Sequence, residues 1–275
     1  MTRGYLTVCC PGARSGPIAQ RTGARSRTGL SCHDKSQDMT TATKLRLRFA
    51  KRGDLRLVSH HDIMRCLERM ARRAQIPLAQ SQGFTPRPRI VFALALGLGI
   101  EGQNEIVDIE LFEPREPADV LCRLAAAAPP GFHWLDAEVL PPGAPAPRPV
   151  ALDYELRVPT QRHAQTLSKL GSLLASSSWP LVRRRPDRDR EQTIDLRPFL
   201  LNAELTDEGV LRARLKVCPD GSARPEELLE CLGLRDLLDQ GAVLVRTHVE
   251  LATDDRTVVL SARGDGAEIP PDDAR

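Results

Sequence analysis

Residues 44–75 read KLRLRFAKRGDLRLVSHHDIMRCLERMARRAQ and change from one hydrophobic periodicity to another. From Lys44 to Phe49 apolar and basic residues alternate, which is the period-two pattern of a half-buried strand. The turn that follows contains Gly53, and Leu55 and Leu57 predict a return strand. The fold therefore opens with antiparallel β-structure.

The second half of the same stretch predicts an amphipathic helix. Ser59 is a preferred N-cap residue, and Asp62 three residues later makes a variant of the capping box. Apolar residues then recur with helical spacing to about Gln75, and Pro77 ends the helix.

The rest of the chain repeats this succession of strands and helices. We predict strands at 90–96, 105–112, 132–140, 152–158, 179–182, 193–196, 200–205, 210–217 and 242–251, and helices at 117–128, at 161–175 and from Pro225. The elements predicted up to residue 140 follow the order β(β)αββαβ, and those predicted from residue 152 onward follow a similar order. This arrangement indicates an α+β fold made of two tandem ferredoxin-like (βαββαβ-type) domains with antiparallel sheets.

Composition sets the expected domain boundaries. The Pro-rich run at 142–149 predicts a linker between a first domain at 44–141 and a second at 150–252. Residues 1–43 are rich in Arg, Gly, Ser and Thr and lack a periodic apolar pattern. We interpret them as a disordered or mis-called extension, with Met39 as the initiator, and residues 253–275 as a loose tail.

Composition also excludes several classes of protein. No apolar run approaches the roughly 20 residues of a membrane-spanning helix, so we expect a soluble, cytoplasmic protein. Seven cysteines are scattered without CxxC or CxxxCxxC spacing, which argues against an iron–sulfur cluster and against a disulfide framework. We expect no cofactor and no metal ion.

Positive charge is concentrated in one segment. Residues 44–89 hold twelve Lys and Arg against three acidic residues, a net charge of +9, whereas the whole chain carries +3. Such asymmetry indicates an anion-binding face, although an Arg-rich, highly soluble surface is the alternative. In the predicted helix one arc carries a basic stripe that could contact phosphates, consisting of His61, Arg65, Arg69, Arg72 and Arg73.

The loop after this helix adds an aromatic ring to the cations. It reads SQGFTPRPR at residues 81–89, where the prolines favour an extended chain. Phe84 beside Arg87 and Arg89 suits the stacking of an unpaired base. The alternative is that Phe84 is a core residue that anchors the loop. We predict that the basic stripe, Phe84, Arg87 and Arg89 form an RNA-binding surface.

Catalytic signatures are missing from the sequence. His60, His61 and Asp62 are neighbours on a helix and therefore face different ways, with His60 expected at the helix–sheet interface. No Ser/His/Asp, HExxH or paired-carboxylate signature occurs, so we predict no catalytic residue. A metal-independent ribonuclease that uses His60 or His61 is a further alternative, by analogy with RNA endonucleases of tandem-plait architecture.

Several motifs resemble a known family. Ser59-His60-His61-Asp62, Gly83-Phe84-Thr85-Pro86-Arg87-Pro88 and Leu96-Gly97-Leu98-Gly99-Ile100-Glu101 resemble the bacterial radical-SAM-linked family of uncharacterised proteins, as do Asp195-Leu196-Arg197-Pro198 and Arg224-Pro225-Glu226-Glu227. Members are fused to, or encoded beside, radical SAM enzymes with a B12-type domain. Because this chain has no cluster motif, the resemblance implies a separate radical SAM partner.

Together these observations predict an accessory RNA-binding protein. It would present structured RNA, tRNA or rRNA, to the separate radical SAM modifying enzyme. The alternative is a protein–protein docking module for the same partner without RNA, because phosphates and carboxylates attract the same arginines.

Overall fold

A computed structural model describes residues 43–185, 188–218 and 221–252. The extension and the tail expected at the two ends lie outside these residues, except for Thr43, which begins the first strand. The strands are β1 Thr43–Lys51, β2 Ile90–Phe92, β3 Glu101–Leu111, β4 Phe132–Leu140, β5 Pro149–Arg157, β6 Pro180–Arg185, β7 Arg188–Asp195, β8 Leu200–Leu205, β9 Val210–Cys218, β10 Gly221–Ser222 and β11 Val245–Leu251. The helices are α1 His60–Arg73, α2 Pro117–Ala127, α3 His163–Ala175, α4 Pro225–Leu232 and α5 Asp236–Asp239, and short 3₁₀ turns occur at η1 Gly53–Leu57, η2 Thr160–Arg162 and η3 Arg197–Phe199.

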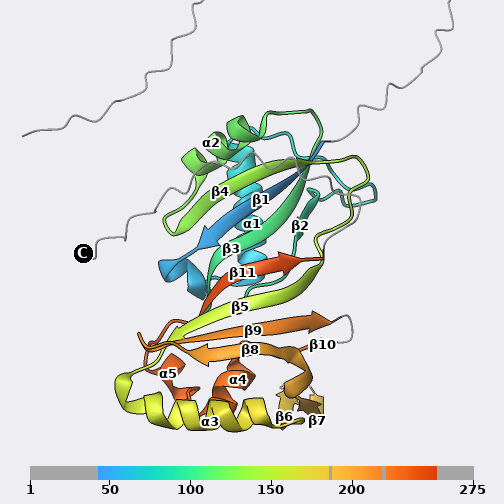
Figure 1. Ribbon diagram of the computed structural model, residues 1–275. Coiled ribbons are helices and arrows are strands. Elements are labelled where there is room, and N and C mark those ends of the chain that lie inside the picture. Colours follow the sequence, from blue (N-terminus) through green and yellow to red (C-terminus); the bar gives the residue numbers. More distant parts are fainter. Residues whose placement is uncertain (1–42, 186–187, 219–220, 253–275) are drawn as a thin grey trace, which may run out of the picture. The chain divides into compact units, whose positions relative to one another are not determined.

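Nine strands form one sheet that runs through both halves of the described chain (Figure 1). Its order is β10-β9-β5-β11-β3-β1-β4, with β2 also paired to β3 and β8 to β9. The pairs are antiparallel except β11 with β3, which run parallel over Val245–Arg246 and Glu101–Gly102. The first half thus has the order β4-β1-β3-β2 and the second half β8-β9-β5-β11, and β3 and β11 join them.

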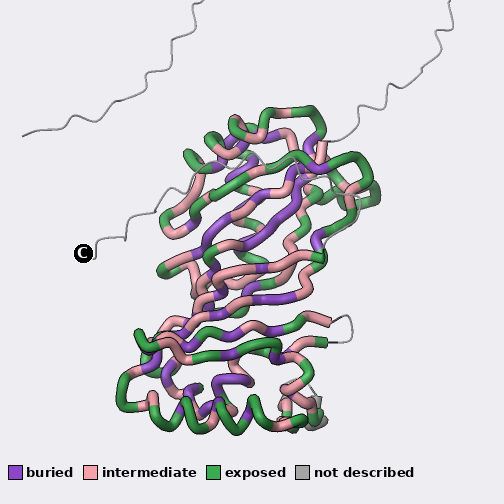
Figure 2. The backbone as a smooth tube through the Cα atoms, in the orientation of Figure 1, coloured by how far each residue is buried: buried purple, intermediate pink, exposed green. Residues whose placement is uncertain are grey.

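Two hydrophobic cores lie on the helical side of this sheet. Buried residues accordingly occur along the strands of both halves (Figure 2). In the first core, Leu45, Leu47 and Phe49 of β1 pack with α1 and α2. In the second, alternate residues of β5 and β9, Tyr154 among them, pack with α3 and α4. The opposite side, which we call the open face, carries the residues between them in each strand, Arg46, Arg48, Asp108, Asp153, Arg212 and Arg214.

A buried ion pair joins the two halves where β3 meets β11. Arg246 Nε donates to Glu105 Oε1 at 2.8 Å, and its Nη2 donates to Glu105 Oε2 at 2.5 Å. The same guanidinium reaches the carbonyl oxygens of Leu94 and Ala95 at 3.4 and 3.3 Å. Both side chains are almost fully buried, at 2 and 4 % exposure. Gly102 makes room for this pair, because a Cβ there would lie 2.5 Å from Glu105 Cγ.

A second cation is buried beside the same carboxylate. Lys51 is 2 % exposed, and its Nζ donates to the carbonyl oxygen of Val58 at 3.0 Å. Burial lowers the pKa of Lys51, and the nearby charge of Glu105 acts in the opposite direction. The carboxylate of Glu105 therefore lies close to two buried cations, as the ion-pair partner of Arg246 and as the nearby negative charge that favours the charged form of Lys51.

The predicted α+β class is confirmed, with a large and mostly antiparallel sheet. The two predicted tandem ferredoxin-like domains are not confirmed as separate sheets, because strands from residues 44–141 and 150–252 share one sheet. The boundaries between those domains stay a prediction, and Pro149, placed in the linker, begins β5.

Some local predictions were wrong. Residues 53–57 form the 3₁₀ turn η1 and not a return strand, because Glu101 accepts a hydrogen bond from the N–H of Gly53 and fixes the turn beside β3. The strand predicted at 90–96 stops at Phe92. Beyond it the backbone turns so that the carbonyl oxygens of Leu94 and Ala95 accept from Arg246.

We expect Glu105→Gln to destabilise the protein more than Arg246→Met does. Loss of the carboxylate leaves both Lys51 and Arg246 buried without a counter-charge, and an unpaired buried charge costs about 3–5 kcal/mol. Loss of the guanidinium leaves Glu105 still compensated by Lys51. The free energy of unfolding in urea measures the difference. Glu155→Gln, which removes only an exposed contact to Arg212, is the control and should cost at most about 1 kcal/mol. Equal losses for the two buried variants would contradict this ranking.

Candidate nucleic-acid interface

The helix α1 is built as the sequence predicts. The Ser59 hydroxyl accepts from the N–H of Asp62 at 3.3 Å and donates to the Asp62 carboxylate at 2.7 Å. Ile63, Leu67 and Met70 are buried against the sheet. The helix therefore has one fixed apolar face, and its opposite face must be solvated.

The basic stripe lies on this solvated face. All five of its members are exposed: His61, Arg65, Arg69, Arg72 and Arg73. Arg65 has only a long contact of 3.4 Å with the exposed Asp62. Within the described residues, no carboxylate lies at ion-pair distance from Arg69, Arg72 or Arg73. The stripe thus presents cations that the fold itself does not neutralise.

The loop after α1 is a hydrogen-bonded hairpin that starts only a few residues beyond the helix. Leu78 bridges to Leu111 at the end of β3, and Gln80 bridges to Pro88 across the hairpin. The N–H of Ser81 donates to the carbonyl oxygen of Arg87 at 2.8 Å, and the N–H of Arg87 returns a bond to the Ser81 hydroxyl at 3.0 Å. We call residues 79–89 the arginine hairpin.

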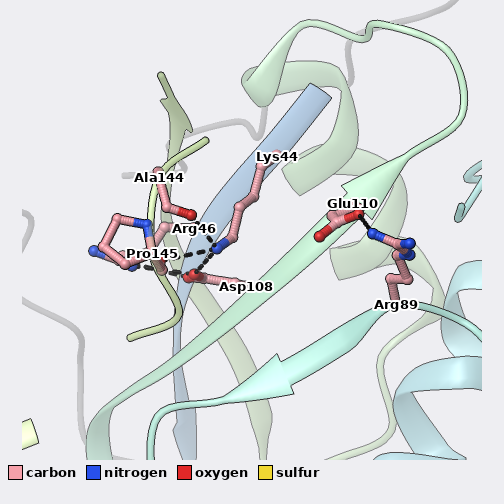
Figure 3. Close-up of polar contacts among 7 residues, drawn as sticks. All are labelled: Lys44, Arg46, Arg89, Asp108, Glu110, Ala144 and Pro145. Carbon is pink, nitrogen blue, oxygen red and sulfur yellow. Dashed lines mark hydrogen bonds and ion pairs between the residues drawn. The ribbon is translucent and has the colours of Figure 1, made fainter. Parts of the chain in front are cut away.

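Phe84 lies at the tip of the arginine hairpin and is fully exposed, with a relative exposure of 111 %. The alternative that Phe84 anchors the loop in the core was therefore wrong. Arg87 is exposed in the same tip. Arg89 lies at the base, where its Nη1 donates to Glu110 at 2.8 Å (Figure 3). Of the two predicted hairpin cations, Arg87 is thus the freer one.

Other cations of the basic segment have structural partners on the open face. Arg46 donates to both oxygens of Asp108 at 2.8 and 3.1 Å, and Lys44 Nζ lies 3.1 Å from the same carboxylate (Figure 3). Lys44 also donates to the carbonyl oxygens of Ala144 and Pro145, which ties the Pro-rich run to β1. Asp108 is 1 % exposed. The excess of charge counted in the sequence is therefore larger than the charge available to a ligand.

His60 and His61 are separated as expected, with ring centroids 6.0 Å apart. His60 packs edge-on against Phe92 at 5.1 Å and lines a narrow hollow with Lys51 and Glu105, and His61 is exposed. Burial lowers the pKa of His60, and the charges of His61 and Lys51 lower it further. A neutral imidazole beside a buried lysine suits a helix–sheet contact.

Sequence reasoning missed the buried group Lys51, Glu105 and Arg246. A signal for two of them was present, because Lys51 continues the alternation of Leu47 and Phe49, and Glu105 continues that of Val107 and Ile109. That register puts both charges on the core face, where an ionised side chain needs a partner. The partner, Arg246, is remote in sequence and has no comparable signal.

Two further findings concern the described residues alone. No group of three or more His, Cys, Asp and Glu side chains there could hold a metal ion. None of the helices in those ranges combines the length and the apolar character needed to cross a membrane.

The chain belongs to the family described as "Uncharacterized protein conserved in bacteria" (DUF2344), whose model matches residues 44–225. This range contains the basic stripe, the arginine hairpin and Glu105, and it ends before Arg246. A search of curated proteins finds no match.

Among solved structures, the chain is similar to one from "Crystal Structure of a Cbf5-Nop10-Gar1 Complex", with 12% identity and a TM-score of 0.39. The match covers 76% of this chain and 49% of the other, so the chain spans about half the length of that protein. It is also similar to an unknown protein from Galdieria sulphuraria, with 12% identity and a TM-score of 0.23, over 77% of this chain and 99% of the other.

We expect the environment of His60 to make folding pH-dependent. Its pKa in the folded protein lies below the ordinary value of 6.5, so the unfolded chain binds more protons in acid. Stability should therefore fall as the pH drops through 6.5, and His60→Gln should reduce this fall. Urea unfolding at a series of pH values measures it. His61→Gln, at the exposed neighbour, is the control and should keep most of the dependence. An unchanged profile in His60→Gln would contradict the prediction.

Proposed function

We propose that this protein is an accessory RNA-binding protein, and that the basic stripe with the arginine hairpin is its RNA-binding surface. The observation that carries the proposal is the row of exposed arginines on α1, of which Arg69, Arg72 and Arg73 have no carboxylate at ion-pair distance among the described residues and Arg65 has only the long contact to Asp62. An unneutralised row of guanidinium groups attracts a polyanion, and guanidinium forks match phosphate oxygens in geometry.

The shape of the surface supports RNA as the polyanion. Arg65 and Arg72 lie on one helical arc and are separated by roughly 10 Å along the axis, at 1.5 Å per residue. The arginine hairpin begins within a few residues of Arg73 and adds Arg87 and Phe84. Cations in a row with a neighbouring aromatic ring are the usual components of an RNA-binding surface.

The partner of this surface forms the second part of the proposal. The resemblance of residues 59–101 to the radical-SAM-linked family supports a separate radical SAM enzyme with a B12-type domain as the consumer of the bound RNA. The accessory chain would hold tRNA or rRNA, and the enzyme would modify it. The strand orders of the two halves further support two ferredoxin-like units fused edge to edge through β3 and β11.

We expect the affinity for total tRNA to fall steeply with salt and to depend on the basic stripe. Each phosphate contact adds about −0.7 to −0.9 to the slope of log K against log salt. Arg65→Ala/Arg69→Ala should therefore weaken binding and make the slope shallower by about 1.4 to 1.8. Filter binding at graded salt concentrations measures both quantities.

The matched control removes the same charge from the second half. Arg157→Ala/Lys216→Ala replaces two exposed cations on β5 and β9 and should leave the slope unchanged. If both double variants lose the same affinity, the attraction is unspecific and the proposed surface is wrong. If the wild type shows no salt-dependent RNA binding but retains the radical SAM enzyme after nuclease treatment, the surface is a protein-docking site.

A further inference from the structure

We propose that Phe84 is a stacking residue that makes the protein select RNA with an unpaired base over uninterrupted duplex. This inference rests on the proposed RNA-binding function and names the feature of the RNA that the site reads. The Phe84 ring is wholly exposed at the tip of the arginine hairpin, which is an unusual position for a large apolar side chain.

The arginine hairpin holds the ring at a defined place. Its two sides are joined by the bond from the N–H of Ser81 to Arg87 and by the bond from the N–H of Arg89 to Ala79, at 2.8 and 2.9 Å. Pro86 and Pro88 fix the backbone on the return side. Gly83 has a backbone φ of +150°, which residues with a side chain rarely adopt. The turn before Phe84 therefore requires glycine. The ring is thus presented on a short, constrained support.

The surroundings of the ring favour a nucleic-acid base over an apolar protein surface. Phe84 is a single ring among the polar residues Gln82 and Thr85 and the cation Arg87, all exposed. A protein-docking core needs several adjoining apolar side chains. A lone ring beside a guanidinium matches an unstacked base next to its phosphate. Bases inside a continuous duplex are already stacked on each other and offer no free face.

Only a short connection separates α1 from the arginine hairpin along the chain. The helix ends at Arg73, and the first bridge of the hairpin region is at Leu78. From Ala79 to Phe84 the chain can extend by roughly 16 Å at 3.3 Å per residue. An RNA whose backbone follows the basic stripe could therefore place a nearby unpaired base on Phe84.

The test uses two RNA hairpins that differ by one nucleotide: one has a single unpaired 2-aminopurine in a bulge, and in the other an added uridine pairs with it, so that the stem is fully paired. We expect the wild-type chain to bind the bulged RNA more tightly and to quench its fluorescence. Because stacking on an aromatic side chain contributes about fivefold to 150-fold in affinity per base, Phe84→Ala should lose the preference by that factor. Phe84→Trp should keep it. Phe84→Leu, which remains apolar but has no aromatic face, should lose it.

Phe112→Ala is the matched control. Phe112 is another exposed phenylalanine of the first half, at 64 %, but it stands next to Glu113 and near Glu110. Its replacement should leave the preference for the bulged RNA unchanged. Thermal unfolding of each variant checks that the fold is intact.

The outcomes separate the two proposals. If both RNAs bind with equal, stripe-dependent affinity, or if Phe84→Leu binds like the wild type, the stacking role is overturned and the RNA-binding function stands. If neither RNA binds, both proposals are overturned.

Discussion

The pair of Glu105 and Arg246 is the contact on which the arrangement of the sheet depends. β3 and β11 share only two register pairs, so backbone bonding between the halves is brief. The side chains extend that junction, because one guanidinium satisfies both a carboxylate of β3 and two carbonyl oxygens of the turn after β2. Burying a carboxylate is costly unless it is paired, and here the same pairing also accommodates Lys51. The carboxylate of Glu105 and the carbonyl oxygens of Leu94 and Ala95 therefore receive this guanidinium only when β11 is in place.

A second consequence concerns the distribution of charge between the two sides of the sheet. On the open face the cations of β1 and β9 meet acidic partners on other strands, as Arg46 meets Asp108 of β3, and Arg214 meets Asp153 of β5 and Glu250 of β11. Cross-strand pairs of opposite charge stabilise a sheet locally and leave little net field. The arginines of α1 have no such ladder opposite them. The arginines of the open face are therefore less available to a ligand than those of α1. Neighbouring strands pair their charged side chains with each other, whereas an exposed helical face has no strand opposite it.

This difference also explains how much could be predicted from the sequence. The alternation of Leu45, Leu47 and Phe49 and the cap at Ser59 are local signals, and both elements occur where they indicate. The exposure of the basic stripe follows from helical spacing alone. By contrast, the end of β2, the turn η1 and the neutralisation of Arg89 depend on Arg246, Glu101 and Glu110, which lie on other elements. Local periodicity carries no information about such partners, so the exposure of the candidate residues was predicted better than the packing around them.

The strand β3 connects the buried ion pair with the proposed RNA-binding surface. Its N-terminal end carries Glu105 and pairs with β11, and its C-terminal end pairs with Leu78 and accepts the arginine hairpin through Glu110. The same strand pairs with β1, and α1 packs against the core face of β1. One rigid strand therefore fixes both the helix that carries the cations and the hairpin that carries Phe84. A ring on a flexible loop would lose conformational entropy on stacking, whereas a ring whose support is already paired to a sheet loses little of it.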